Sequence, residues 1–180
     1  MTGRLFIVVG PSGVGKDTLL AGVTAANPTL HWARRVITRA EVAGGEPFDA
    51  VTPPVFAARL QAGEFALHWQ AHGLSYGVPQ AQIAPLDAGR DVLVNGSRAA
   101  LLAARAAFPK LVVICLTAPP AVLAERLAAR GRESRADIDA RLQRAGYALP
   151  EGLPVIDIAN DSTPQVGIAR LLAALQAPSG

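Results

Sequence analysis

The chain has 180 residues, the size of one domain, and 51% of them are hydrophobic, which excludes a disordered chain. The longest apolar run lies within Leu111–Leu116, far short of the roughly 20 residues that a membrane span needs. Cys115 is the single cysteine, so an intrachain disulfide is excluded, and its place in an apolar run predicts a core residue. The N-terminal apolar run Leu5–Val9 is too short for a secretion signal, so we expect a cytoplasmic protein.

The positive charge of the chain is concentrated in one segment. Residues 126–144 carry six arginines and three acidic residues, and this excess equals the net charge of +3. One compact cluster fits a clamp for a few phosphates better than the long basic stripe of a nucleic-acid-binding protein, although a solvated charged helix is the alternative. We therefore expect phosphorylated small molecules as ligands, and neither nucleic acid nor a membrane.

Strands and helices alternate along most of the chain, which predicts an α/β fold with a parallel sheet and helices on both of its faces. The expected strands are Leu5–Val9, Trp32–Ile37, Asp91–Val94, Leu111–Leu116 and Val155–Ala159. The expected helices are Asp17–Ala26, 97–107, 119–129, one that Ser134 caps, and one that opens at Thr163-Pro164.

Residues 38–78 follow a different pattern and predict a small inserted lobe. The turn residues Gly44-Gly45 precede a short helix at Pro53–Gln61 and two further runs, Phe65–Trp69 and Leu74–Val78. We therefore expect a single domain in three parts. The core is 1–37, 79–125 and 145–180, the acceptor-binding lobe is 38–78, and the arginine-rich lid is 126–144.

A phosphate-binding motif follows the first strand. Gly10-Pro11-Ser12-Gly13-Val14-Gly15-Lys16 fits the Walker A pattern G-x-x-x-x-G-K. Glycines let successive backbone N–H groups point into one concavity, and the next helix directs the positive end of its dipole at the same anion. Lys16, one of only two lysines beside 15 arginines, adds a charge for the β- and γ-phosphates.

The motif departs from the pattern at its last position, where a serine or threonine hydroxyl normally binds Mg²⁺. Here Asp17 stands in that place and Thr18 follows. A carboxylate can bind Mg²⁺ directly or through water, so we expect Asp17 to be the metal ligand. The alternatives are that Asp17 only caps the helix, or that Thr18 or Asn95 contacts the metal.

Several strings, in order over nearly the whole chain, resemble the guanylate kinases. They are Gly10–Lys16, Tyr76-Gly77 at the end of the lobe, Arg126–Gly131 followed by Asp137–Leu142, and Asn160-Asp161 after the last strand. The resemblance implies a P-loop kinase with a five-stranded parallel sheet flanked by helices, an inserted acceptor lobe and a lid.

Three departures separate the chain from guanylate kinases. His68 stands where those enzymes have a glutamate that reads the guanine edge, and a neutral imidazole cannot replace a bidentate acceptor. Arg39 is followed by Ala40-Glu41-Val42, without the second arginine of those enzymes, and Asn95–Arg98 replaces the acidic residues after the middle strand.

These departures, with Asp17 and the lobe string Phe65–Val78, are similar to the ribose 1,5-bisphosphate phosphokinases of phosphonate breakdown. That resemblance implies ATP-dependent phosphorylation of ribose 1,5-bisphosphate to 5-phosphoribosyl 1-diphosphate (PRPP), with ATP and Mg²⁺ as cofactors. It implies no oligomeric state. Two alternatives are a guanylate kinase, against which His68 argues, and a non-catalytic guanylate-kinase-like binding module, which would need neither Lys16 nor the lid arginines.

The resemblance also implies roles for single residues. Lys16, Arg130 and Arg141 are the expected catalytic residues, and the ATP site adds Gly10–Thr18, Arg126 and Asn160, the last of these reading adenine. Arg39, His68 and Tyr76 are the expected acceptor-binding residues, and His72 is a further candidate. The structural alternatives are an Asp137–Arg141 pair, a turn role for Asn160, a buried packing role for Tyr76 and Trp69, and surface positions for both histidines. The acceptor is an ionised phosphate, so we assign no general base.

Overall fold

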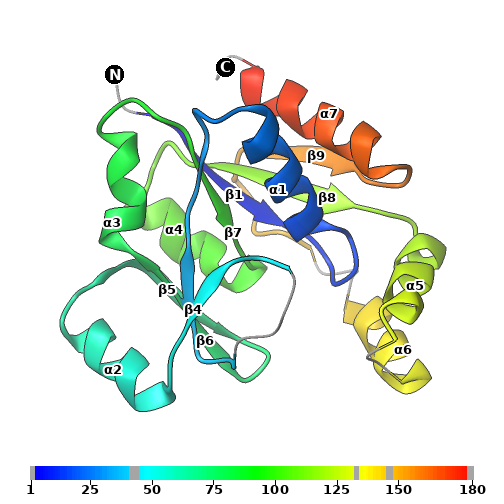
Figure 1. Cartoon of the computed structure of the whole chain (residues 1–180), viewed down its shortest axis with the longest axis horizontal. Coiled ribbons are helices and arrows are strands. Elements are labelled where there is room, and N and C mark those ends of the chain that lie inside the picture. The colour runs from blue at the N-terminus through cyan, green and yellow to red at the C-terminus, as the bar shows by residue number, and fades with distance from the viewer. Residues whose placement is uncertain (1–2, 41–44, 132–133, 145–147, 178–180) are drawn as a thin grey trace.

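The structure, a computed structural model, describes residues 3–40, 45–131, 134–144 and 148–177, with the side chain of Arg144 excepted. These residues form two sheets (Figure 1). The larger sheet is parallel throughout and has the strand order β2-β7-β1-β8-β9, which confirms the predicted five-stranded core. Its strands are β1 (Leu5–Val9), β2 (His31–Trp32), β7 (Val92–Asn95), β8 (Val112–Thr117) and β9 (Val155–Ala159).

The central strand β1 is buried on both faces, as a parallel sheet covered by helices requires. Phe6 and Val8 point into a cluster with α1 (Lys16–Ala26), α5 (Pro120–Ala129) and α7 (Pro164–Gln176). Leu5, Ile7 and Val9 point into a second cluster with α4 (Leu101–Ala107) and with the smaller sheet. The phosphate-binding motif therefore follows the most firmly packed strand of the molecule.

The smaller sheet has the order β4-β3-β6-β5 and belongs to the lobe. Its strands are β3 (Arg35–Ile37), β4 (Phe48–Ala50), β5 (Phe65–Ala71) and β6 (Leu74–Pro79), and α2 (Pro53–Gln61) lies between β4 and β5. The single strand predicted at Trp32–Ile37 is wrong. The chain leaves the core sheet after Trp32 and enters the lobe sheet at Arg35, ahead of the predicted boundary at residue 38. Both pieces are apolar, so the sequence pattern does not mark where the chain changes sheet.

The hairpin of β5 and β6 closes with a two-residue turn, His72-Gly73, in which both residues have left-handed backbone angles (φ 52° and 73°). This is the turn chemistry of a tight hairpin, and it fixes the register with Trp69 opposite Tyr76. Because side chains alternate along a strand, Trp69 and Tyr76 share one face of the lobe sheet, here called the inner face, and His68 lies on the other. Trp69 and its inner-face neighbours belong to the core cluster of Ile7.

The predicted lid, 126–144, comprises the end of α5 and the helix α6 (Arg135–Arg144), and the two helices pack against each other beside the phosphate-binding motif (Figure 1). Ser134 caps α6, since the Asp137 N–H donates to the Ser134 hydroxyl (3.2 Å) and the Ser134 N–H donates to the Asp137 carboxylate (3.1 Å). Residues 132–133 of the predicted lid and Gly44 of the predicted lobe turn lie outside the described residues.

Three short helices complete the described chain: α3 (Gln80–Ile83), η1 (Ala84–Leu86) and η2 (Arg98–Ala100). The first two follow β6 and were not predicted. Within the described residues, the helices are all too short or too polar to span a bilayer.

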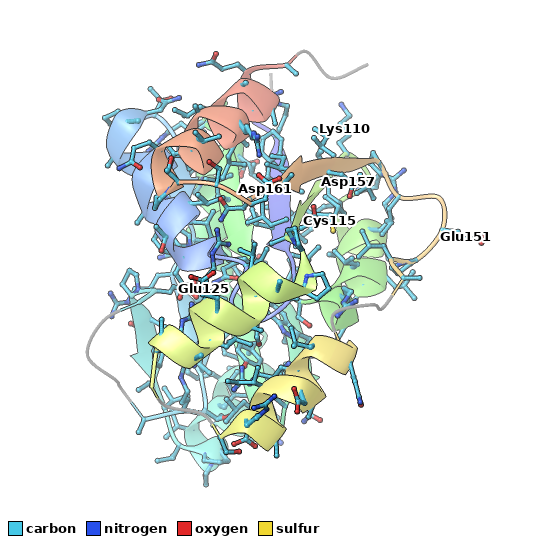
Figure 2. The ribbon with its side chains drawn as sticks, turned by 90° about the vertical axis from the view of Figure 1, so that its right-hand side faces the viewer. Lys110, Cys115, Glu125, Glu151, Asp157 and Asp161 are labelled. Carbon is cyan, nitrogen blue, oxygen red and sulfur yellow. The ribbon has the colours of Figure 1, made fainter. Side chains whose placement is uncertain are left out.

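Cys115 faces Asp157 across the β8–β9 pair (Figure 2) and packs against the core cluster of Ile7. Burial raises the pKa of this thiol, and the neighbouring Asp157 carboxylate raises that pKa further. A thiol with a raised pKa is a poor nucleophile, so Cys115 is a packing residue of the sheet.

The outer face of the lobe sheet supplies a test of the packing. Phe65 stacks on Phe56 of α2 with ring centroids 4.8 Å apart, and a Cβ added at Gly77 would lie 2.6 Å from the Phe65 ring. We expect Gly77→Ala to lower the free energy of unfolding by about 1–3 kcal/mol, because the rigid ring must shift. Denaturant unfolding measures this. Ser75→Ala, two residues away on the same strand, is the control and should change it by less than about 0.5 kcal/mol.

Candidate active site

A cavity of about 500 Å³ lies where the carboxyl ends of β1 and β7 meet the inner face of the lobe. Ligands of α/β proteins bind at this edge of a parallel sheet. The cavity is bounded by the phosphate-binding loop, the lobe, the segment after β7 and two lid arginines. Its lining comprises Gly10, Pro11, Ser12, Gly13, Gly15, Lys16, Asp17, Arg35, Arg39, Trp69, Ala71, His72, Leu74, Tyr76, Asn95, Gly96, Ser97, Arg98, Arg130 and Arg141.

The loop between β1 and α1 has the conformation of an anion cradle. Gly15 caps α1 with a left-handed backbone (φ 94°), and a Cβ there would lie 2.8 Å from the amide nitrogen of Asn160. The Val14 N–H donates to the Pro11 carbonyl (3.2 Å), which closes the turn. Asn160, buried at the end of β9, donates to the Val14 carbonyl (2.7 Å) and so holds the loop from behind.

Lys16 lies in the cavity and donates to the Gly10 carbonyl at 2.7 Å. Its pKa is lowered to about 8, chiefly by burial; Asp17 and Glu46 oppose the shift, and the cations Arg35 and Arg130 add to it. The ammonium form of Lys16 is therefore destabilised in the absence of an anion. A bound polyphosphate would stabilise it.

A chain of hydrogen bonds joins the loop to the lobe. The Asn95 side-chain amide, at the end of β7, donates both to the Asp17 carboxylate (2.8 Å) and to the Glu46 carboxylate (2.7 Å). Glu46 in turn accepts from Arg35 on β3, at 2.8 Å from Nε and through a second bond from Nη2. The N-cap of α1 is Gly15, and the Asp17 carboxylate is bonded across the site to Asn95. The alternative that Asp17 only caps the helix therefore does not describe its contacts.

Arg35 is buried on the inner face of the lobe with its guanidinium over two aromatic rings. Its central carbon lies 5.1 Å from the Tyr76 ring centroid and 5.9 Å from that of Trp69. Trp69 and Tyr76 are themselves stacked, with centroids 5.4 Å apart. Arg39, an exposed neighbour, lies over Phe48 at 4.6 Å and reaches the rim of the cavity.

The lid reaches the loop directly. Arg141 donates to the Ser12 hydroxyl at 2.9 Å, and Arg130 also lines the cavity. Asp137, the suggested partner of Arg141, is hydrogen-bonded to Ser134, and these bonds lower the pKa of its carboxyl. The structure thus places both predicted lid arginines at the phosphate loop.

Several predicted site residues do not line the cavity. His68 is exposed on the outer face of the lobe sheet, because the hairpin register turns it away from Trp69 and Tyr76, so the cavity lining does not support its predicted acceptor contact, which stays a prediction. Thr18 is exposed on α1. Asn160 and Arg126 instead bond the Val14 carbonyl from outside and support the loop, and the adenine-side roles predicted for both residues stay predictions.

Arg35 and Glu46 were not predicted as site residues, and no role was predicted for Arg98. Arg35 directly follows another arginine in an apolar run, and Glu46 lies in a loop, so neither fits a motif. The signal that could have found Arg35 is its position in the strand, two residues before Ile37 and on the same face.

The described residues contain no group of three or more His, Cys, Asp or Glu side chains that could hold a metal ion by themselves. The Asp17 carboxylate lines the cavity, whereas Glu46 does not and is bonded to Arg35 and Asn95. Asp17 is therefore the carboxylate that suits Mg²⁺, with the remaining ligands of the ion taken from water and phosphates.

The fold and site define a class of protein. A glycine-rich loop between a buried parallel strand and a helix, an inserted lobe across the cavity and an arginine lid together describe a P-loop kinase of the guanylate-kinase type. A solved guanylate kinase from Anaplasma phagocytophilum superposes with a TM-score of 0.71 at 20% identity, covering 97% of this chain and 85% of that one. A gluconokinase from Sinorhizobium meliloti gives a TM-score of 0.55 at 18% identity over 97% of this chain and 91% of that one, so both show the shared fold.

Curated sequences narrow the class to one family. The chain is 49% identical to "Ribose 1,5-bisphosphate phosphokinase PhnN" of Ruegeria sp., over 97% of this chain and 93% of that protein. It is 44% identical to the protein of the same name from Agrobacterium fabrum, over 98% of each. The chain therefore belongs to the ribose 1,5-bisphosphate phosphokinase family. No family model matches it.

Some relatives are longer. A "Bifunctional ribose 1,5-bisphosphokinase-thymidine phosphorylase" from Azorhizobium caulinodans is 50% identical over 98% of this chain, yet the match covers 26% of that protein. The chain thus spans about a quarter of the length of such bifunctional relatives.

The lowered pKa of Lys16 predicts a proton uptake on ATP binding. Above pH 8 the free lysine is neutral, and bound phosphates raise its pKa by stabilising the ammonium form. We expect ATP affinity to fall by up to about tenfold per pH unit as the pH rises above 8. Calorimetry at pH 8.5 in two buffers of different ionisation enthalpy measures the proton uptake. Affinity that stays flat between pH 7.5 and 9.5 would contradict it.

Proposed function

We propose that this chain transfers the γ-phosphoryl group of ATP to the 1-phosphate of ribose 1,5-bisphosphate, giving PRPP and ADP. Two things support the proposal. The relatives that share 44–49% identity along nearly their whole length are named for this phosphokinase activity. The cavity has the phosphate loop on one side and the cationic, aromatic inner face of the lobe on the other.

The observation that carries the proposal is the charge of the cavity lining. Six cationic side chains line it, with Asp17 as a lining carboxylate: Lys16, Arg35, Arg39, Arg98, Arg130 and Arg141. Such an excess suits two polyanions bound together, a triphosphate and a bisphosphate.

Glu46, the buried carboxylate beside the lobe sheet, accepts hydrogen bonds from Arg35 and Asn95, so it is already engaged and unsuited to read a guanine edge.

The chain's residues act by positioning and charge neutralisation. An oxygen of the acceptor 1-phosphate attacks the γ-phosphorus, and the bond from that phosphorus to the β–γ bridging oxygen breaks as ADP leaves. The attacking oxygen is already ionised, so no residue needs to remove a proton. Lys16 and the loop N–H groups hold the β- and γ-phosphates, Arg130 and Arg141 neutralise the transferring group, and Arg39 and Tyr76 hold the acceptor.

Mg²⁺ fits the site through the Asp17 carboxylate, with Glu46 beside it. When bound, the ion would neutralise charge on the phosphates of ATP. Asn95 orients both carboxylates through one amide group. This arrangement also explains how an aspartate can stand beside a phosphate loop, since a cation between them removes the repulsion.

The choice of acceptor is the direct test. We expect ADP release from ATP–Mg²⁺ with ribose 1,5-bisphosphate, and at least about 100-fold lower kcat/KM with GMP, because Glu46, the carboxylate that the structure describes on the inner side of the lobe, is already bonded to Arg35 and Asn95. A coupled ADP assay with both acceptors in parallel measures this. Efficient turnover of GMP would instead make the chain a guanylate kinase, and no ATP binding at all would favour a non-catalytic binding module.

The two lysines of the chain provide a matched pair of variants. Lys16→Met should lower kcat by about 10²- to 10³-fold, because it removes a charge that faces the developing negative charge of the phosphates. Lys110→Met is the control. Lys110 is exposed on the surface and does not line the cavity, so its loss should leave kcat and KM unchanged (Figure 2). Steady-state kinetics decide, and equal rates for both variants would exclude the assigned role of Lys16.

A further inference from the structure

We propose that Arg35 is an acceptor-binding residue that determines selectivity for a phosphorylated sugar, and that Glu46 is its positioning residue. This inference rests on the proposed function. Neither residue belongs to the phosphate-binding motif or to the lid, and both come from the lobe side of the cavity.

The donor geometry of Arg35 points to a ligand. A guanidinium has five N–H donors in a rigid plane. Glu46 accepts from Nε and from Nη2 of Arg35, and among the described residues Nη1 has no hydrogen-bond acceptor. The Tyr76 ring lies behind the group, 5.1 Å from its central carbon, so the unused N–H groups project from the edge of a stacked plane. Because Arg35 lines the cavity, an anionic oxygen of the acceptor can take these donors.

Glu46 makes the position of Arg35 possible. The Arg35 side chain is 10% exposed and that of Glu46 is 3% exposed, and a buried guanidinium without a counter-charge would be strongly unfavourable. Burial raises the pKa of Glu46, whereas Arg35 and the bond from Asn95 oppose that rise and favour the carboxylate. Since Asn95 also bonds Asp17, Glu46 fixes Arg35 relative to the phosphate loop and not only within the lobe.

The neighbouring arginine shows that this arrangement is specific to one position. Arg34 is exposed, its Nε donates to Asp49 at 2.5 Å, and neither residue lines the cavity. Arg34 and Arg35 are therefore adjacent arginines, and each is paired with a carboxylate. Of the two, Arg35 lines the cavity and Arg34 does not. Arg34→Met is thus a matched control for Arg35→Met.

The experiment measures substrate binding and turnover for the two variants. We expect Arg35→Met to raise the KM for ribose 1,5-bisphosphate by about 10- to 100-fold, as for a lost hydrogen bond to a charged group, and to change the KM for ATP by less than about threefold. Calorimetric titration with ribose 1,5-bisphosphate alone should show the same loss, and Arg34→Met should behave as the wild type. An unchanged acceptor KM in Arg35→Met, or a loss confined to ATP, overturns the proposal.

Two further variants separate binding from folding. Arg35→Met leaves Glu46 without its cation, so Arg35→Met/Glu46→Gln removes both charges, and it should unfold at a temperature close to that of the wild type while still failing to bind the acceptor. Glu46→Gln alone should raise the acceptor KM, and Glu46→Asp should restore part of the loss. If Glu46→Gln has wild-type acceptor KM and kcat, the positioning role is excluded.

The same measurements distinguish this proposal from the proposed function. A wild-type chain that neither binds nor phosphorylates ribose 1,5-bisphosphate refutes the proposed function itself. A wild-type chain that does both, with an Arg35→Met variant of equal affinity, refutes only the role of Arg35.

Discussion

One line of hydrogen bonds holds the two halves of this site together. It runs from Asp17 in the first turn of α1, through the Asn95 amide at the end of β7, to Glu46 and Arg35 in the lobe. Its members are polar and mostly buried, and buried polar groups are stable only when their partners are in place. These bonds therefore favour the observed position of the lobe relative to the phosphate loop, since breaking them would leave buried polar groups unpaired.

The charges along this line explain the state of Lys16. Burial is the largest cause of its lowered pKa, Arg35 and Arg130 act in the same direction, and Asp17 and Glu46 oppose the shift without cancelling it. A site that binds two polyanions must carry more positive charge than its own carboxylates can balance. In the ligand-free protein this excess destabilises the ammonium form of the buried Lys16. Binding of the phosphates then relieves it, so the site is preorganised for charge that arrives with the substrates.

The sequence was sufficient for the core and the phosphate loop because both depend on local patterns. A buried parallel strand reads as a continuous apolar run, and the loop needs glycines at fixed spacing before Lys16. The acceptor side depends instead on which face of a strand a residue occupies. His68 and Trp69 are adjacent in sequence, yet the hairpin register points one outward and the other into the core. Asn160 shows the same limit, because an amide after the last strand can read a base or hold a loop, and the bond to the Val14 carbonyl is visible only in the structure.

The register of the lobe hairpin is thus the structural basis of the acceptor site. The two-residue turn at His72-Gly73 sets Trp69 opposite Tyr76 and stacks both rings, and Arg35 packs its guanidinium on them. A turn longer by one residue would exchange the faces of one strand relative to the other, because the side-chain period of a strand is two. It would bring His68 or Ser75 inward and leave Arg35 without an aromatic surface. Because Trp69 and its inner-face neighbours also pack into the core cluster of Ile7, such a change would disturb the core as well, so the register of this hairpin fixes the acceptor side and its attachment to the core sheet together.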